Sequence, residues 1–279
     1  MRIFQLNSVL INKLVYFCFM RMSHKLIDYY IHSSLHVALS LLCLSWLTLW
    51  RVSQSLNFLL PMCVFAGTVL AYNALKYSKL IYDGNLQSPL FEVVVVSAVF
   101  ALLLFGGCFY LLSFRLQLLI VIAGFFVFMY PLLRKFGSIK IFWVSFVIAF
   151  TTSFVIIQSV LNFNGNVMLL LLERFLFLCA LMVPFEIRDS QYDDVSLKTL
   201  PQRLGIQKMK YLGFSFCLLF LIVGVYNGRA MRISDGVVVL FLMWSIYRIQ
   251  PNSSKYSTLF WVEAIPIAGF LVDIVIAKN

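Results

Sequence analysis

Long apolar stretches alternate with short polar ones along the chain. A membrane-crossing helix needs about 20 mostly apolar residues, and nine stretches approach that length. They are residues 34–50, 56–75, 90–112, 115–133, 141–161, 166–185, 209–227, 235–248 and 257–276. Lipid-exposed sheets with open edges are excluded, because their backbone groups would lack hydrogen-bond partners. The pattern therefore predicts an all-α, polytopic membrane protein with about nine transmembrane helices.

The chain has no long polar insertion and no obvious repeat, so residues 34–279 are expected to form one transmembrane domain. Residues 1–33 are expected to form an N-terminal cytoplasmic or interfacial segment. Within it, "VLINKLVYFCFM" is too short to span, and no small-residue cleavage site follows it. Either this part is an interfacial helix or translation starts at Met22 and residues 1–21 are not translated; we favour the later start.

Composition supports the membrane interpretation. Hydrophobic residues make up 62% of the chain, charged residues only 12%, and the mean hydropathy is +0.94. Soluble domains have roughly 45–50% apolar and about 25% charged residues. The net charge of +11 has no soluble basic domain to carry it, so we expect the lipid bilayer and not nucleic acid as the partner.

The basic residues predict the orientation of the chain. With the N-terminus placed inside, sixteen Lys and Arg residues fall in the N-terminal segment and after spans two, four, six and eight, and five fall on the other side. The five are Arg51, Arg115, Arg229, Arg232 and Lys278. Because cytoplasmic loops carry the excess of Lys and Arg, we expect a multi-pass protein of the cell or inner membrane. Its N-terminus and these loops would be cytoplasmic and its C-terminus on the opposite side.

One cytoplasmic loop concentrates acid. "PFEIRDSQYDDVSLKTLPQRLG" holds four of the eleven carboxylates in the chain. Asp189 and Asp193 are four residues apart and would share one face of a helix. Mg²⁺ typically takes one or two carboxylates plus substrate phosphates, and Arg188, Lys198 and Arg203 could meet those phosphates directly. The alternative is an ordinary solvated loop.

The same loop resembles a known motif. "RDSQYD…KTLPQRLG" is similar to the second Asp-rich motif of the UbiA superfamily of membrane prenyltransferases. The matching residues are Asp189, Asp193, Lys198, Thr199, Leu200, Pro201, Leu204 and Gly205. The chain departs from the family by lacking an Ala-Gly step before the lysine and by running one residue shorter there.

A second resemblance follows the fourth span. "YPLLRKF" resembles the Tyr-Pro and basic pair of that family, which would place Tyr130, Arg134 and Lys135 near a diphosphate. A proline that ends a helix beside a positive-inside pair would explain the segment equally well.

The first Asp-rich motif is degenerate. In "YNALKYSKLIYDGN", Asn73 is in place, but Ala74, Tyr77 and Ile81 stand where the family has aspartates. Lys76 and Lys79 lie where acid is expected. They either replace a metal ion as phosphate ligands or simply follow the positive-inside rule.

The resemblance implies a helical bundle around a central cavity. It further implies prenyl transfer from an isoprenoid diphosphate to a lipophilic, often aromatic, acceptor, with Mg²⁺ as the cofactor. The expected catalytic residues are Asp189, Asp193 and Lys76, of which the two aspartates bind metal. The expected substrate-binding residues are Asn73, Tyr130, Arg134, Lys135, Arg188 and Lys198. A non-catalytic protein that binds a lipid phosphate, and a degenerate scaffold, are the alternatives.

Charged residues inside the spans leave a further alternative. Glu173 and Arg174 interrupt the sixth span, and Arg174 is expected to pair with Glu92, Glu263 or Asp273. Glu263 and Asp273 could share a side of the ninth span and line an ion path. A transporter is the less favoured alternative, because the chain shows no inverted repeat and no matching pair of broken helices.

Overall fold

The computed structural model describes residues 26–53, 57–82, 89–160, 165–227 and 232–277. The interpretation of residues 1–21 and of the start codon lies outside this range. Within it the chain is helical and contains no strand. Residues 26–32 form a short helix that is followed by a turn at Ser33 and Ser34.

The helices follow the predicted spans in order. They are α2 (Leu35–Ser53), α3 (Leu59–Tyr82), α4 (Pro89–Leu111), α5 (Phe114–Leu133), α6 (Lys140–Ala149), α7 (Gly165–Asp189), α8 (Leu200–Leu204), α9 (Ile206–Tyr226), α10 (Ile233–Arg248) and α11 (Ile265–Ala277). Two π-helical segments, η1 (Phe150–Val155) and η3 (Ser257–Val262), continue α6 and precede α11, and a 3-10 turn, η2 (Val195–Leu197), precedes α8. An all-α fold is confirmed.

In the described chain, seven helices are long and apolar enough to cross a membrane. The other two predicted spans are shorter: the apolar helix Lys140–Val155, formed by α6 and η1, and the 16-residue α10. Their length of about 24 Å falls somewhat short of a hydrocarbon core of about 30 Å. The chain is therefore a multi-pass integral membrane protein.

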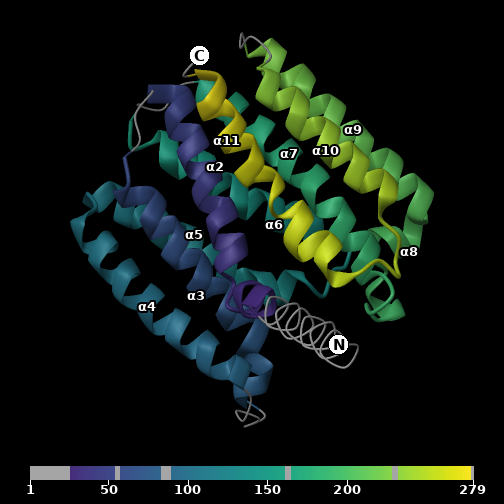
Figure 1. Ribbon diagram of the computed structural model, residues 1–279, viewed down its shortest axis with the longest axis horizontal. Helices are drawn as coiled ribbons and strands as arrows, with labels where there is room; N and C mark the ends of the chain where they lie inside the picture. Colours follow the sequence, from purple (N-terminus) through teal and green to yellow (C-terminus); the bar gives the residue numbers. More distant parts are fainter. Residues whose placement is uncertain (1–25, 54–56, 83–88, 161–164, 228–231, 278–279) are drawn as a thin grey trace, which may run out of the picture.

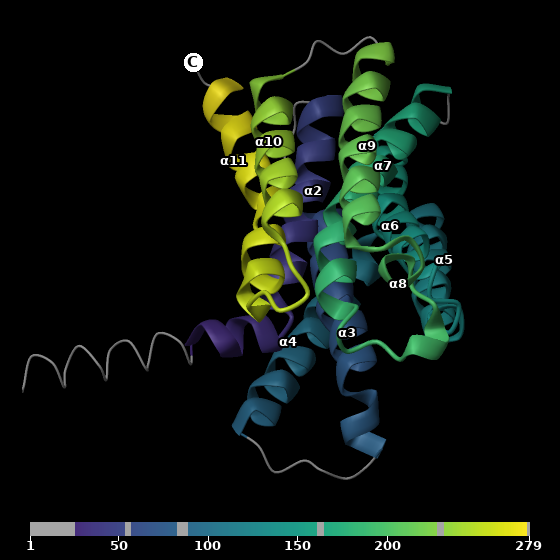
Figure 2. The same cartoon turned by 90° about the vertical axis from the view of Figure 1, so that its right-hand side faces the viewer.

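The long helices form a bundle (Figures 1 and 2). Neighbouring pairs run from α5 through α6, α7, α9, α10 and α11 to α2, α3 and α4. The π-helical segment η1 contacts α2, α3, α5 and α7 and so lies inside the bundle. The helices thus bring polar residues that are far apart in sequence to the same end of the molecule.

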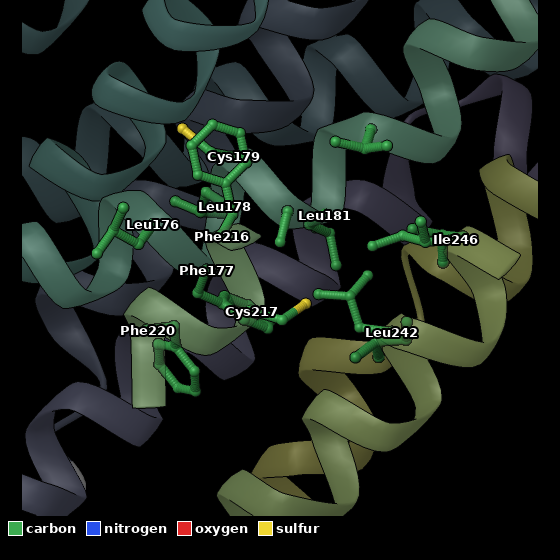
Figure 3. Close-up of a cluster of buried hydrophobic side chains, with 14 of the residues drawn as sticks. Leu176, Phe177, Leu178, Cys179, Leu181, Phe216, Cys217, Phe220, Leu242 and Ile246 are labelled. Atoms are coloured by element: carbon green, nitrogen blue, oxygen red, sulfur yellow. The ribbon is translucent and has the colours of Figure 1, made fainter. Parts of the chain in front are cut away.

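Burial separates inner from outer helices. In the apolar window of α2, 67% of the residues are buried, against 11% in those of α4 and α5. Side chains such as Leu103 and Phe128 are largely exposed, as expected for helices that face lipid. The main core lies between α7, α9 and α10, where Phe177, Phe216 and Leu242 pack together (Figure 3).

The two ends of the bundle differ. We call the end that carries residues 26–34, 134–139, 190–205 and 249–256 the loop end (Figure 2). At the far end, Arg51 of α2 pairs with Asp235 of α10 at 2.7 Å and with Asp273 of α11 at 3.1 Å. Arg232 adds a second ion pair to Asp273 at 3.0 Å, so the far end is held together by buried charges.

Candidate functional site

The acidic loop begins with one further turn of backbone after α7. The N–H groups of Tyr192 and Asp193 both donate to the carbonyl of Asp189, at 2.8 and 2.9 Å. This turn keeps Asp189 and Asp193 on the same side of the chain, as their i, i+4 spacing predicts. Glu186, one turn earlier in α7, extends the same acidic stripe.

Lys140, the first residue of α6, lies among these three carboxylates. Its Nζ is 3.0 Å from Glu186 Oε1 and 3.8 Å from Oδ2 of both Asp189 and Asp193. Glu186 is only 1% exposed and Lys140 is also buried. We call Lys140, Glu186, Asp189 and Asp193 the acidic cluster. Its lysine is supplied by a different helix from its carboxylates.

Arg188 is a second cation beside the cluster. Its Nε and Nη2 donate to Asp189 Oδ1 at 3.2 and 2.8 Å. Its Nη1 donates to the carbonyl of Lys255 at 3.2 Å and to the hydroxyl of Thr258, the second residue of η3. Arg188 thus joins the end of α7 to the loop between α10 and α11.

Two loops meet closely beside the cluster. A Cβ at Gly137 would lie 2.4 Å from the carbonyl oxygen of Leu197, so only glycine fits this contact. Ser138 donates to the carbonyl of Lys198 at 3.4 Å, and Lys198 has a left-handed backbone with φ of 48°. Gln202 donates to the carbonyl of Asp193 at 3.2 Å. The α5–α6 turn and the acidic loop therefore hold each other in place.

A separate polar group lies where residues 26–34 cross the loop end. Asp28 accepts hydrogen bonds from Lys255 and Tyr256, both at 2.8 Å. Partial burial alone would raise the pKa of Asp28, but these two hydrogen bonds hold it below its usual value. The carboxylate is therefore charged at neutral pH and ties this segment to the α10–α11 loop.

The degenerate first motif contacts that segment. Lys76 Nζ and Tyr77 Oη both reach the carbonyl of His32, at 3.5 and 2.8 Å. Asn73 is buried; it accepts from Ser34 Oγ at 2.8 Å and its amide reaches the carbonyl of Ser33 and Ser97 Oγ at 3.4 and 3.3 Å. The polar atoms of Asn73 are thus engaged by protein groups, and its predicted role toward a diphosphate stays a prediction.

The predicted site residues fall into two groups. Asp189, Asp193 and Arg188 meet at the acidic cluster, and Tyr130 lies within electrostatic range of Lys140 and Arg134. Asn73 and Lys76 lie with residues 26–34 instead. The side chains of Arg134, Lys135 and Lys198 are exposed at the loop end. Glu263 lies within electrostatic range of Lys76 in one group and of Arg188 in the other.

Sequence reasoning missed Lys140 and Glu186 as site residues. On the sequence alone, Lys140 counts only as one more positive-inside charge, and Glu186 as one of the four carboxylates of the acid-rich loop. Glu186, Asp189 and Asp193 follow an i, i+3, i+7 pattern that marks a single helix face. That pattern could have identified Glu186, whereas no feature of the sequence connects Lys140 to it.

The acidic cluster as arranged does not fit a divalent metal ion. Mg²⁺–oxygen distances are about 2.1 Å, so an ion bound by both aspartates would lie no more than about 6 Å from the ammonium of Lys140. Like charges at that separation in a partly buried site repel strongly. Among the described residues, no group of three His, Cys, Asp or Glu side chains is arranged to hold a metal ion.

The charged residues within the spans have partners other than those expected. Arg174 donates to Thr48 Oγ1 at 2.9 Å and to Ser153 Oγ at 3.2 Å. Asp273 pairs with Arg51 and Arg232 at the far end, whereas Glu263 lies within electrostatic range of Lys76 and Arg188.

A small cavity of about 50 Å³ lies beside Thr48, Arg51, Glu173 and Arg174. Sixteen residues, or about 24 Å of helix, separate Glu173 from Asp189 along α7. The cavity is large enough to hold water, and it is not part of the acidic cluster.

Comparison with known proteins gives one informative match. No family model matches the chain, and no curated protein matches it either. Among solved structures, the chain is similar to the apo structure of a UbiA homolog from Aeropyrum pernix K1, with a TM-score of 0.58 and 14% sequence identity. The alignment covers 91% of this chain and 99% of that chain. At this identity the match establishes the architecture: the chain has a UbiA-like fold.

Proposed function

We propose that this protein is a UbiA-type prenyltransferase, which transfers an isoprenyl group from an isoprenoid diphosphate to a lipophilic acceptor. The observation that carries the proposal is the position of Asp189 and Asp193 in a UbiA-like fold. They lie at the end of α7, beside Tyr130 and the α5–α6 turn. Fold alone does not assign an activity, so the proposal depends on this site.

In the proposed reaction, the bond between C1 of the isoprenoid and the diphosphate oxygen breaks, and its electron pair leaves with pyrophosphate. The allylic cation then forms a bond to a nucleophilic carbon or oxygen of the acceptor, which loses a proton to water at the loop end. Positive charge aimed at the leaving oxygens lowers the barrier. Lys76, Arg134, Lys135, Arg188 and Lys198 are the basic side chains proposed to receive the diphosphate.

Asp189 and Asp193 act in this proposal as positioning residues. Asp189 pairs with Arg188 and contacts Lys140, and Asp193 also contacts Lys140. Fixed cations stabilise a developing charge better than mobile ones, because they need no reorganisation during the reaction. The mechanism uses no metal ion at the aspartate pair, because the arrangement there does not fit one.

The remaining features follow from the same proposal. We infer that all nine predicted spans cross the bilayer, with α6–η1 and α10 as the two short crossings. The loop end is then cytoplasmic, and the isoprenoid tail lies among apolar side chains within the bilayer. The acceptor is defined only as a lipophilic compound.

A second candidate function is binding of an isoprenoid or other lipid phosphate without chemistry. The observation that favours it is the first motif, in which three aspartates of the family pattern are replaced by Ala74, Tyr77 and Ile81. A site that lacks these three carboxylates and carries Lys76 in their place could still hold a phosphate.

The test uses the purified full chain in lipid nanodiscs. Farnesyl and geranylgeranyl diphosphate are offered with an aromatic hydroxy acid and a lipid extract as acceptors, in Mg²⁺ and in EDTA, and pyrophosphate release is measured. We expect release by the wild type and a loss of about ten-fold or more in Lys76→Ala and in Asp189→Asn. Lys208→Ala, an exposed lysine at the start of α9, is the matched control and should keep full activity.

Two other outcomes are informative. Saturable binding of the diphosphates without release would overturn prenyl transfer and favour the second candidate. No binding of either diphosphate would contradict both functions and leave a degenerate scaffold.

A further inference from the structure

The acidic cluster contains three carboxylates in a partly buried site. Glu186, Asp189 and Asp193 lie on one face of the end of α7, and Glu186 is almost completely buried. Grouped carboxylates in a partly buried site are unstable unless a cation neutralises them. Proteins solve this problem with a bound metal ion or with a basic side chain.

Lys140 is the basic side chain that lies among these carboxylates. Its ammonium lies between 3.0 and 3.8 Å from one oxygen of each carboxylate. The contact to Glu186 is a close ion pair, and the two 3.8 Å contacts to Asp189 and Asp193 are longer ion pairs. One side chain therefore contacts every carboxylate of the cluster at once, which is the arrangement that a central metal ion would otherwise provide.

The position of Lys140 on α6 supports this interpretation. It is the first residue of the helix, after the N-cap Ile139. Helix N-termini carry partial positive charge and favour acidic residues, so a lysine there is unfavourable on local grounds. The three carboxylates of α7 and its following turn offset that cost, so the reason for a lysine at this place is tertiary.

We propose that the Lys140 ammonium is the resident cation of the acidic cluster and takes the place of a divalent metal ion at the Asp189–Asp193 pair. The relevance of this replacement to prenyl transfer rests on the proposed function, but the replacement itself concerns only the charges of the folded chain. The wild-type cluster is then complete without metal, and removing Lys140 turns it into a metal site.

The experiment measures binding of Mn²⁺ alone, by electron paramagnetic resonance, to the full-length protein in nanodiscs of zwitterionic lipid. Mn²⁺ serves as a probe for Mg²⁺, because both prefer carboxylate oxygens. We expect no saturable Asp193-dependent binding to the wild type. In Lys140→Met we expect saturable Asp193-dependent binding, with an affinity at least about ten-fold above any residual binding of Mn²⁺ to the wild type, because a positive charge within about 6 Å of the site has been removed.

Three further variants locate and control the effect. Asp193→Asn in the Lys140→Met background should abolish the new site, and Lys208→Met, which removes an exposed lysine at the start of α9, should show the same Mn²⁺ binding as the wild type. If Lys140→Met fails to fold, Lys140→Met/Glu186→Gln takes its place, since it removes one charge of each sign and keeps both aspartates.

The proposal is overturned by either of two results. Mn²⁺ binding to the wild type that is lost in Asp193→Asn would show that the lysine does not replace the metal. Absence of binding in every folded variant without Lys140 would show that the lysine does not occupy a metal position. Neither result depends on pyrophosphate release, so failure of the proposed function and failure of this inference are distinguishable.

Discussion

Lys140 and Glu186 form a buried ion pair whose two members depend on each other. The pair is 3.0 Å long, and Glu186 has almost no contact with solvent. Removing one member of a buried pair leaves an uncompensated charge, which is more damaging than replacing both members by neutral groups. At the scale of single residues, the acidic cluster should therefore behave as a unit.

A double-mutant cycle tests this dependence. We expect Lys140→Met to lower the free energy of unfolding by about 3–5 kcal/mol, because Glu186 loses its cation. The double variant Lys140→Met/Glu186→Gln should recover a substantial part of that loss. Unfolding is followed by circular dichroism in mixed micelles as the denaturing detergent is increased.

Lys135→Met is the matched control for the cycle and should change the unfolding free energy by no more than about 0.5 kcal/mol. Strictly additive effects of the two single substitutions would contradict the dependence, because independent residues show no coupling energy.

Close helix packing fixes the distance between α7 and its neighbours. Gly213 of α9 faces Val183 of α7 and Ile246 of α10, and an added Cβ would lie 3.1 and 3.0 Å from these side chains. In a membrane the hydrophobic effect does not drive helices together, and small residues at interfaces gain van der Waals contact instead. At the scale of elements, the position of the end of α7 depends on this contact.

Gly213→Leu should disturb that contact. Overpacking a tight interface costs about 1–3 kcal/mol, so we expect a corresponding loss of unfolding free energy in the same micelle assay. Gly124→Leu in α5 is the control, because a Cβ there meets no atom within 4 Å. Equal losses in both variants would show that the effect comes from the glycine substitution itself and not from the interface.

The whole molecule is polarised by its charges. The loop end collects basic side chains from several loops, many of them exposed. At the far end, Arg51 and Arg232 are engaged by Asp235 and Asp273, and Arg115 donates to Gln158. Lys140, Arg188 and Lys255 at the loop end are paired as well, so the difference between the two ends rests on the exposed basic side chains of the loop end.

Cysteine labelling tests the resulting orientation. In a Cys18→Ser background, where the other five cysteines are buried, we expect a membrane-impermeant maleimide to label Ser113→Cys in intact cells. Ser196→Cys should react only after the cells are permeabilised. Both positions are exposed, at opposite ends of the bundle. The reverse labelling pattern would contradict a cytoplasmic loop end.

The all-α membrane architecture, the order of the helices and the shared face of Asp189 and Asp193 could be predicted from the amino-acid sequence. These properties follow from apolar length and helical period, which are local. The position of Lys140 among the carboxylates, the hydrogen bond from Ser34 to Asn73 and the hydrogen bonds from Arg174 to Thr48 and Ser153 could be seen only in the folded structure. Such partners depend on which helices pack together and on the relative positions of these helices along the bundle axis. The sequence of a uniformly apolar span carries little information about this packing, because lipid-facing and core-facing side chains are equally apolar.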